Sequence, residues 1–99
     1  MIRKISGKQN LYTKNYKNMF SLCAYANVIL KENGVFLGRT DRESGLLFEL
    51  ADNEGFFNIF VELRDGLNQD ALAEKAKTFI DEEEIETFIS RLIQEGIIE

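Results

Sequence analysis

The chain has 99 residues, of which 44% are hydrophobic and 29% are charged, and its formal net charge is −5 at pH 7. This length and balance predict one globular domain with a single core, and no apolar run of about 18 residues is present to span a bilayer. There is no histidine and only one cysteine, Cys23, which excludes an internal disulfide and the usual zinc ligand sets.

Several enzyme classes are disfavoured by the same inventory. Without histidine there is no imidazole base, and no glycine-rich nucleotide loop of the GxGxxG or Walker type occurs. The composition does not exclude catalysis by an Asp/Glu acid–base pair, although such carboxylates usually form a solvated helix face. Cys23 sits in an apolar run and is expected to be a buried hydrophobe. We therefore expect no enzyme activity and no cofactor. Since no signal-peptide pattern opens the chain, we also expect a cytoplasmic location.

Charge is distributed unevenly along the chain. Residues 1–19 carry five basic side chains and no acid, giving +5, whereas residues 20–99 sum to −10. The first segment has only scattered apolar residues, so we expect a basic, weakly structured arm followed by a domain at 20–99. Five dispersed charges without amphipathic periodicity make a weak footprint for nucleic acid or a membrane surface, and neither partner is expected.

The first ordered elements are predicted to be strands. Residues 21–30 are rich in strand formers, and Asn33-Gly34 supplies the positive-φ pair of a type I′ turn, so residues 35–37 should pair back on them. Turn-forming residues at 40–45 precede a third short strand at 46–50. The pattern predicts a three-stranded antiparallel meander.

Two helices should follow. Asp52 or Asn53 can cap the first, which has Phe56, Phe57, Phe60 and Leu63 on one side and ends at Gly66. Asn68 can cap the second, a short helix whose inward residues would be Leu72, Ala73 and Ala76.

A third helix has the clearest signals. Asp81 and Glu84 have the spacing of a capping box, and Ile80 can pack on Ile85 as a hydrophobic staple. The core-facing stripe has helical spacing and consists of Ile85, Phe88, Ile89, Leu92 and Ile93. Gly96 should end the helix in a Schellman motif, with Ile97 packing back on Leu92.

A three-stranded sheet followed by three helices predicts an α+β fold of the winged helix-turn-helix type. Many such folds bind DNA, but the third helix offers Arg91 against a predominantly acidic surface, including Asp81, Glu82, Glu83, Glu84 and Glu86. Phosphates would be repelled by that surface. DNA binding and a purely structural interaction module therefore stand as alternatives to peptide binding.

Three stretches carry a family resemblance: residues 61–66 (Val-Glu-Leu-Arg-Asp-Gly), residues 70–72 (Asp-Ala-Leu) and residues 88–98, which close with Gly-Ile-Ile. With the hairpin, they make residues 34–99 resemble PqqD-like proteins, the recognition elements of pathways that make ribosomally synthesised and post-translationally modified peptides (RiPPs). The resemblance implies that the chain binds the leader segment of a precursor peptide and presents it to a peptide-modifying enzyme.

In that family the leader is added as a strand beside the third strand, in the groove between this strand and the third helix. An unpaired strand edge beside apolar pockets can accept an extended peptide in this way. Carried onto this chain, the resemblance implies a binding site formed by Leu46, Leu47, Phe48, Glu49 and Leu50 of the strand and by Glu82, Ile85, Glu86 and Ile89 of the helix. The two glutamates are expected to rim the groove and to favour a guest with Lys or Arg.

Overall fold

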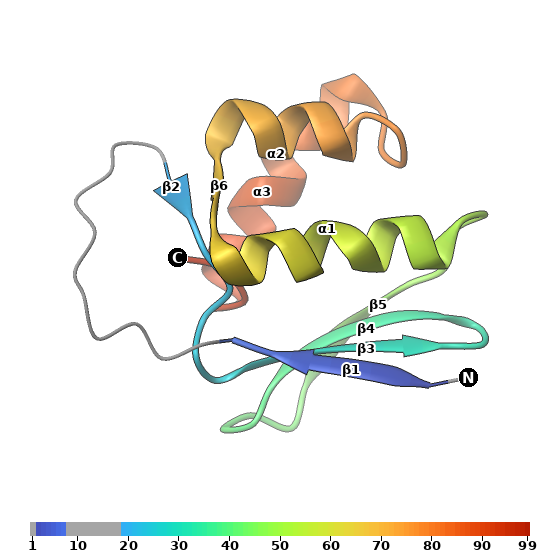
Figure 1. Ribbon diagram of the computed structural model, residues 1–99, viewed down its shortest axis with the longest axis vertical. Helices are drawn as coiled ribbons and strands as arrows, with labels where there is room; N and C mark the ends of the chain where they lie inside the picture. Colours follow the sequence, from blue (N-terminus) through green and yellow to red (C-terminus); the bar gives the residue numbers. More distant parts are fainter. Residues whose placement is uncertain (1, 8–18) are drawn as a thin grey trace.

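The computed structural model describes residues 2–7 and 19–99, and it has two layers (Figure 1). An antiparallel sheet forms one layer and three helices cover one of its faces, which confirms the α+β class. The sheet has the order β1-β3-β4-β5, with β1 at Arg3–Ser6, β3 at Ala26–Lys31, β4 at Gly34–Arg39 and β5 at Gly45–Phe48. The helices are α1 at Asn53–Asp65, α2 at Gln69–Ala76 and α3 at Ile85–Gln94, and a 3₁₀ turn, η1, precedes α3 at Glu82–Glu84.

The main sheet has four strands where the sequence predicted three. The additional strand, β1, comes from the segment that we expected to be weakly structured, and it pairs antiparallel with β3. Ile5 packs against the core, while the Arg3 guanidinium lies 5.1 Å from the ring centroid of Phe57 and 3.7 Å from a Glu54 carboxylate oxygen. These contacts stabilise the strand against α1. Residues 1 and 8–18 of the proposed arm lie outside the described residues.

The strand predicted at 21–30 begins later than expected, at Ala26. The first residues of the predicted strand instead bond to the C-terminal segment. Leu22 forms a β-bridge with Ile98, and the Cys23 amide donates to the Ile97 carbonyl oxygen at 2.8 Å. A second small sheet pairs β2 (Met19–Phe20) with β6 (Leu67–Asn68), between α1 and α2.

The β3–β4 hairpin forms, but its turn lies one residue earlier than predicted. Lys31 pairs with Gly34, so Glu32 and Asn33 make the two-residue loop and Gly34 is the first residue of β4. A Cβ atom at Gly34 would lie 2.5 Å from the carbonyl oxygen of Phe48 on β5. Glycine is therefore needed here for the close approach of two strands.

Helix ends follow the sequence signals with one exception. The Asp52 carboxylate accepts from the Gly55 amide at 2.9 Å, and Asn68 accepts from the Ala71 amide at 2.7 Å, as predicted. The prediction of a capping box at Asp81 is wrong. The Asp81 side chain makes no capping hydrogen bond to the described residues, and the Glu84 amide donates to the Asp81 carbonyl oxygen at 2.8 Å instead. This backbone bond closes the 3₁₀ turn, so the regular helix starts only at Ile85.

At its other end, α3 closes with the predicted Schellman motif. Gly96 has φ 72°, the Ile97 amide donates to the Leu92 carbonyl oxygen at 2.9 Å, and the Gly96 amide donates to that of Ile93 at 3.0 Å. Most of the predicted stripe is buried, but Ile93 is 46% exposed. It lies at the edge of the stripe, where the helix turns its side chain away from the core.

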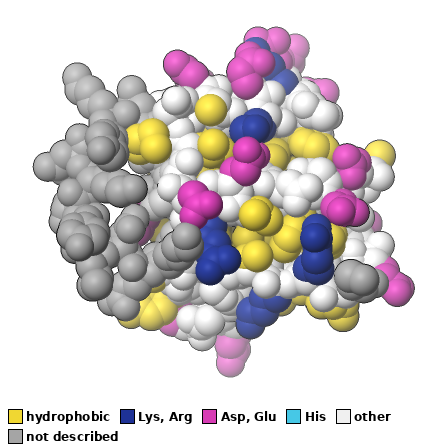
Figure 2. Space-filling view, in the orientation of Figure 1, with side chains coloured by type: hydrophobic (Ala, Val, Ile, Leu, Met, Phe, Trp, Pro, Cys, Tyr) yellow, Lys and Arg dark blue, Asp and Glu magenta, His cyan; other side chains and the backbone are white. Residues whose placement is uncertain are grey.

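The core lies between the sheet and the helices. Its largest fully buried side chains are Phe56, Phe57, Phe60, Leu22, Leu37, Leu63, Leu72, Leu92, Ile97, Ile98, Val28 and Val35. On the face drawn in Figure 2, acidic side chains gather at the top, whereas basic side chains lie beside hydrophobic patches in the lower half. Among the described residues, no helix combines the length and the apolar character that crossing a membrane requires.

Candidate functional site

Strand β5 lies at one edge of the sheet, and only β4 pairs with it among the described residues. The hydrogen-bond pattern of the β3–β4 hairpin determines which residues of β5 direct their backbone groups away from the sheet. The Thr40 amide donates to the Tyr25 carbonyl oxygen at 2.8 Å, which extends the β3–β4 ladder. Even-numbered residues of β4 therefore direct their backbone groups towards β3, and the odd-numbered ones direct theirs towards β5.

The partners of β5 follow from this alternation. Val35 pairs with Phe48, and Leu37 pairs with Leu46. Leu46 and Phe48 consequently direct their amide and carbonyl groups towards β4. Leu47, between them, directs its amide and carbonyl groups outward from the sheet edge. The edge thus offers a donor and an acceptor for one more strand.

An open groove of about 620 Å³ runs beside this edge. It lies between β5 on one side and the segment from the end of α2 to α3 on the other. Its lining residues are Leu46, Leu47, Phe48, Leu50, Phe79, Ile80, Asp81, Glu84, Thr87, Phe88 and Arg91.

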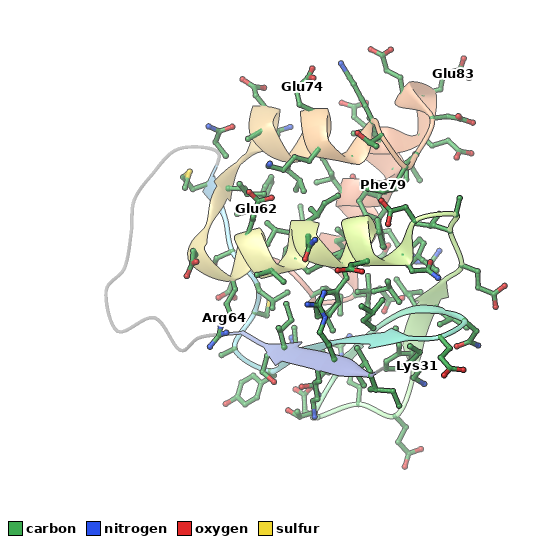
Figure 3. The ribbon with its side chains drawn as sticks, turned by 45° about the vertical axis from the view of Figure 1, so that its right-hand side comes forward. Lys31, Glu62, Arg64, Glu74, Phe79 and Glu83 are labelled. Atoms are coloured by element: carbon green, nitrogen blue, oxygen red, sulfur yellow. The ribbon has the colours of Figure 1, made fainter. Side chains whose placement is uncertain are left out.

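Aromatic rings form the floor of the groove. The ring centroid of Phe48 lies 5.4 Å from that of Phe56 and 5.8 Å from that of Phe88, the latter in an edge-to-face arrangement. Phe79 lies 5.8 Å from Phe56, also edge to face. Figure 3 shows Phe79 below the 3₁₀ turn and pointing towards α1. Because these rings also pack in the core, the floor is preformed.

The structure brings part of the predicted site to this groove. The strand predicted at 46–50 is observed at Gly45–Phe48, so Glu49 and Leu50 follow it. Leu46, Leu47, Phe48 and Leu50 line the groove, with Leu47 47% exposed, whereas Glu49 is exposed and lies outside the lining.

The helix residues of the predicted site lie elsewhere. Ile85 and Ile89 are only 6% and 7% exposed and belong to the core. A Glu82 carboxylate oxygen lies 3.8 Å from the Lys77 ammonium, and Glu86 lines a second cavity of about 490 Å³ on another side of α3. None of these four residues is among the described residues that line the groove.

The helical side of the groove is formed by the next face of α3 together with the last residue of η1. Its residues are Glu84, Thr87, Phe88 and Arg91, which follow the spacing i, i+3, i+4, i+7. The sequence-based site lay one residue away because it took Ile85 and Ile89, two residues of the predicted core-facing stripe, for the groove as well. Ile85 and Ile89 cover the core, whereas Phe88 of the same stripe also lines the groove, beside the polar residues Glu84, Thr87 and Arg91.

Three further lining residues, Phe79, Ile80 and Asp81, were missed as site residues. The sequence signal was the apolar pair Phe79-Ile80 between two polar segments. Both side chains are only partly buried against the core, so each leaves apolar surface for the groove.

A charged clamp joins α3 to the sheet at the far end of the groove. Arg39 on β4 donates to both carboxylate oxygens of Asp41, at 2.7 and 2.8 Å, and to the Gly96 carbonyl oxygen at 2.9 Å. The hydrogen bond from Arg39 lowers the pKa of Asp41 below its usual range. Arg42 donates to the Glu95 carbonyl oxygen at 3.3 Å. These contacts hold the C-terminus of α3 beside the turn that leads into β5, which fixes the relative position of the groove walls.

Comparison with known proteins returned no matching family model, no matching curated protein and no matching solved structure. Within residues 2–7 and 19–99, no group of three or more Cys, Asp or Glu side chains is arranged to hold a metal ion.

Proposed function

We propose that this chain is a winged helix-turn-helix recognition module of the PqqD-like kind, which binds the leader segment of a ribosomally made precursor peptide in the cytoplasm. The bound leader would be presented to a peptide-modifying enzyme, and the chain itself would act without catalysis or a cofactor. The observation that carries the proposal is the outward-facing backbone of Leu47 at the β5 edge beside an apolar groove.

Strand addition explains why these two features occur together. An extended peptide would form main-chain hydrogen bonds with the edge of β5, and these bonds give affinity. Alternate side chains of the peptide would enter the groove above Phe48 and Phe88, which gives specificity. A preformed floor lowers the ordering cost of binding because only the guest must become ordered.

DNA binding is less well supported by the charges. The N-terminal part of the α3 region carries Glu82, Glu83 and Glu84, followed by Glu86, and a recognition helix would have to bring these carboxylates close to phosphates. A purely structural interaction module would also leave the aligned edge and groove without a role.

The decisive experiment measures binding of labelled peptides to backbone variants of β5. The probes are synthetic N-terminal segments of short peptides encoded beside this protein's gene, and the readout is fluorescence anisotropy. Leu47→Pro removes the outward amide but no bond to β4, and proline is tolerated on edge strands. We expect it to weaken binding about tenfold, the cost of one lost hydrogen bond together with its distorted neighbours.

Leu47→Ala is the matched control because it removes the same side chain and keeps the amide. It should bind clearly better than Leu47→Pro, and thermal unfolding should show both variants folded. Equal affinities for the two variants would contradict strand addition. Failure of every segment to bind, together with salt-dependent binding of generic duplex DNA, would favour the DNA-binding alternative.

A further inference from the structure

The groove has a defined direction because α3 and β5 run in opposite senses along it. Phe48 and Phe88 meet in the middle, with ring centroids 5.8 Å apart. At the N-terminal end of β5, Gly45 and Leu46 share a small cavity with Glu95, just past the C-terminus of α3. Beyond the other end, Leu50 lines the groove together with Phe79 and Ile80, which precede η1.

Charge differs between these two ends. The groove lining contains three charged side chains, Asp81, Glu84 and Arg91. Asp81 and Glu84 lie at the N-terminal end of the α3 region, near the C-terminal end of β5. Arg91 lies two turns along the helix, near the N-terminal end of β5. Its side chain is 57% exposed, although a Glu95 carboxylate oxygen lies 3.6 Å from its Nε. The groove is therefore anionic at one end, apolar in the middle and cationic at the other end.

The spacing of these charges matches alternate residues of a guest strand. Glu84 and Arg91 are seven residues apart, which is about 10 Å along a helix. Side chains on one face of a strand recur about every 7 Å, so positions i and i+4 are about 13 Å apart. Flexible Lys, Arg or Glu side chains can absorb the difference.

We infer that the groove selects peptides with a basic residue, an apolar residue and an acidic residue at alternate positions, in that order from N- to C-terminus. This inference rests on the proposed function and specifies its ligand. The order follows from antiparallel addition, the more stable pairing and the one that all strands of this sheet use. An antiparallel guest starts opposite the C-terminal end of β5, where Asp81 and Glu84 lie.

A yeast-displayed library of random dodecapeptides tests the inference without knowledge of the natural ligand. Labelled wild-type protein should enrich the pattern basic-x-apolar-x-acidic. Individual clones carrying Lys-x-Leu-x-Glu should bind about three- to tenfold more tightly than clones carrying Glu-x-Leu-x-Lys, since solvated rim pairs contribute modestly.

A charge-swapped protein provides the second arm. The double variant Glu84→Lys, Arg91→Glu keeps the net charge constant and exchanges two exposed side chains. Because Asp81 is retained, the formal charges of the two ends change from −2 and +1 to 0 and −1, so the more anionic end becomes the one at position 91. It should enrich the reversed order, acidic-x-apolar-x-basic. Glu83→Lys is the matched control: Glu83 neighbours Glu84 on η1 but lies outside the groove lining and projects away from the body of the protein in Figure 3, so it should keep the wild-type order.

The outcomes separate the inference from the proposed function. The library could enrich peptides with apolar residues at alternate positions but no fixed order of basic and acidic residues. If those peptides also bind Leu47→Pro poorly, the inference is overturned and strand addition still stands. The same charge order from the wild-type and charge-swapped proteins would also overturn it. Enrichment that Leu47→Pro leaves intact, or no enrichment at all, would count against the site itself.

Discussion

Cys23 illustrates how burial of a single side chain couples this fold to pH. It is 5% exposed, and desolvation, assisted by the negative charge of Glu99, raises the pKa of its thiol to about 11. Because the folded pKa lies above the unfolded one, the thiol's contribution to stability is complete below about pH 8.5 and is lost as pH rises through 11.

The first prediction follows from that sign. Between pH 8 and pH 11, the free energy of unfolding of the wild type should fall by on the order of 2 kcal/mol more than that of Cys23→Ala. Urea unfolding at several pH values measures both slopes, and the difference isolates the thiol from other groups that titrate in the window. Parallel slopes would show that the thiol ionises as freely as in the unfolded chain.

Substitutions at Phe48 and Ile89 distinguish a residue that lines the groove from one that lies only in the core. Ile89→Ala should lower the free energy of unfolding by about 2–4 kcal/mol, because a nearly buried side chain leaves a cavity. Its peptide affinity should stay unchanged at temperatures where it is folded. Phe48→Ala should lose both stability and affinity, since Phe48 packs on Phe56 and also lines the groove. Isothermal calorimetry beside thermal unfolding measures the two quantities; affinity loss in Ile89→Ala without unfolding would contradict the assignment of this residue to the core.

At the scale of elements, Gly96 holds the end of α3 in a conformation that other residues adopt at a cost. Its φ is 72°, and a Cβ atom would lie 2.6 Å from Nη1 of Arg39, the atom that bonds the Gly96 carbonyl oxygen. Gly96→Ala should therefore cost at least about 1 kcal/mol of stability from backbone strain, in addition to displacement of Arg39.

Gly96→Asn distinguishes these two causes because asparagine tolerates the left-handed region but carries the same Cβ. We expect it to recover only part of the loss in urea unfolding. Full recovery would mean that strain alone matters and that Arg39 adapts freely.

The elements that sequence could predict are those whose signals are local. Caps at Asp52 and Asn68, the end of α3 at Gly96 and the α+β order depend on a few neighbouring residues, and all four are observed. Strand β1 was missed because its partner lies more than twenty residues away and only Ile5 marks its buried face. The helical wall of the groove was misplaced for a similar reason: which stripe of α3 meets the core and which meets β5 depends on packing between elements. Local periodicity does not determine that choice.

At the scale of the whole molecule, net charge and local charge make separable contributions to association. The formal net charge is −5, so the field of the entire protein attracts a basic guest. At physiological salt that field decays over about 8 Å, and charges lining the groove should matter more than equal charges elsewhere.

Two pairs of substitutions with the same net effect test this. Because each exchange of a carboxylate for lysine adds two positive charges, both Glu82→Lys with Glu86→Lys and Asp81→Lys with Glu84→Lys take the formal net charge from −5 to −1. The first pair lies outside the groove lining and the second lies within it. With a guest that carries Lys at its anionic-end position, both pairs should slow association at low ionic strength, because long-range steering depends on the summed field. At 0.15 M salt the first pair should associate at nearly the wild-type rate, whereas the second should remain several-fold slower.

Stopped-flow association of one labelled guest at two salt concentrations measures all four rates beside the wild type. If the two pairs behave alike at both concentrations, the acidic surface acts only through net charge, and the groove makes no local selection for a basic residue.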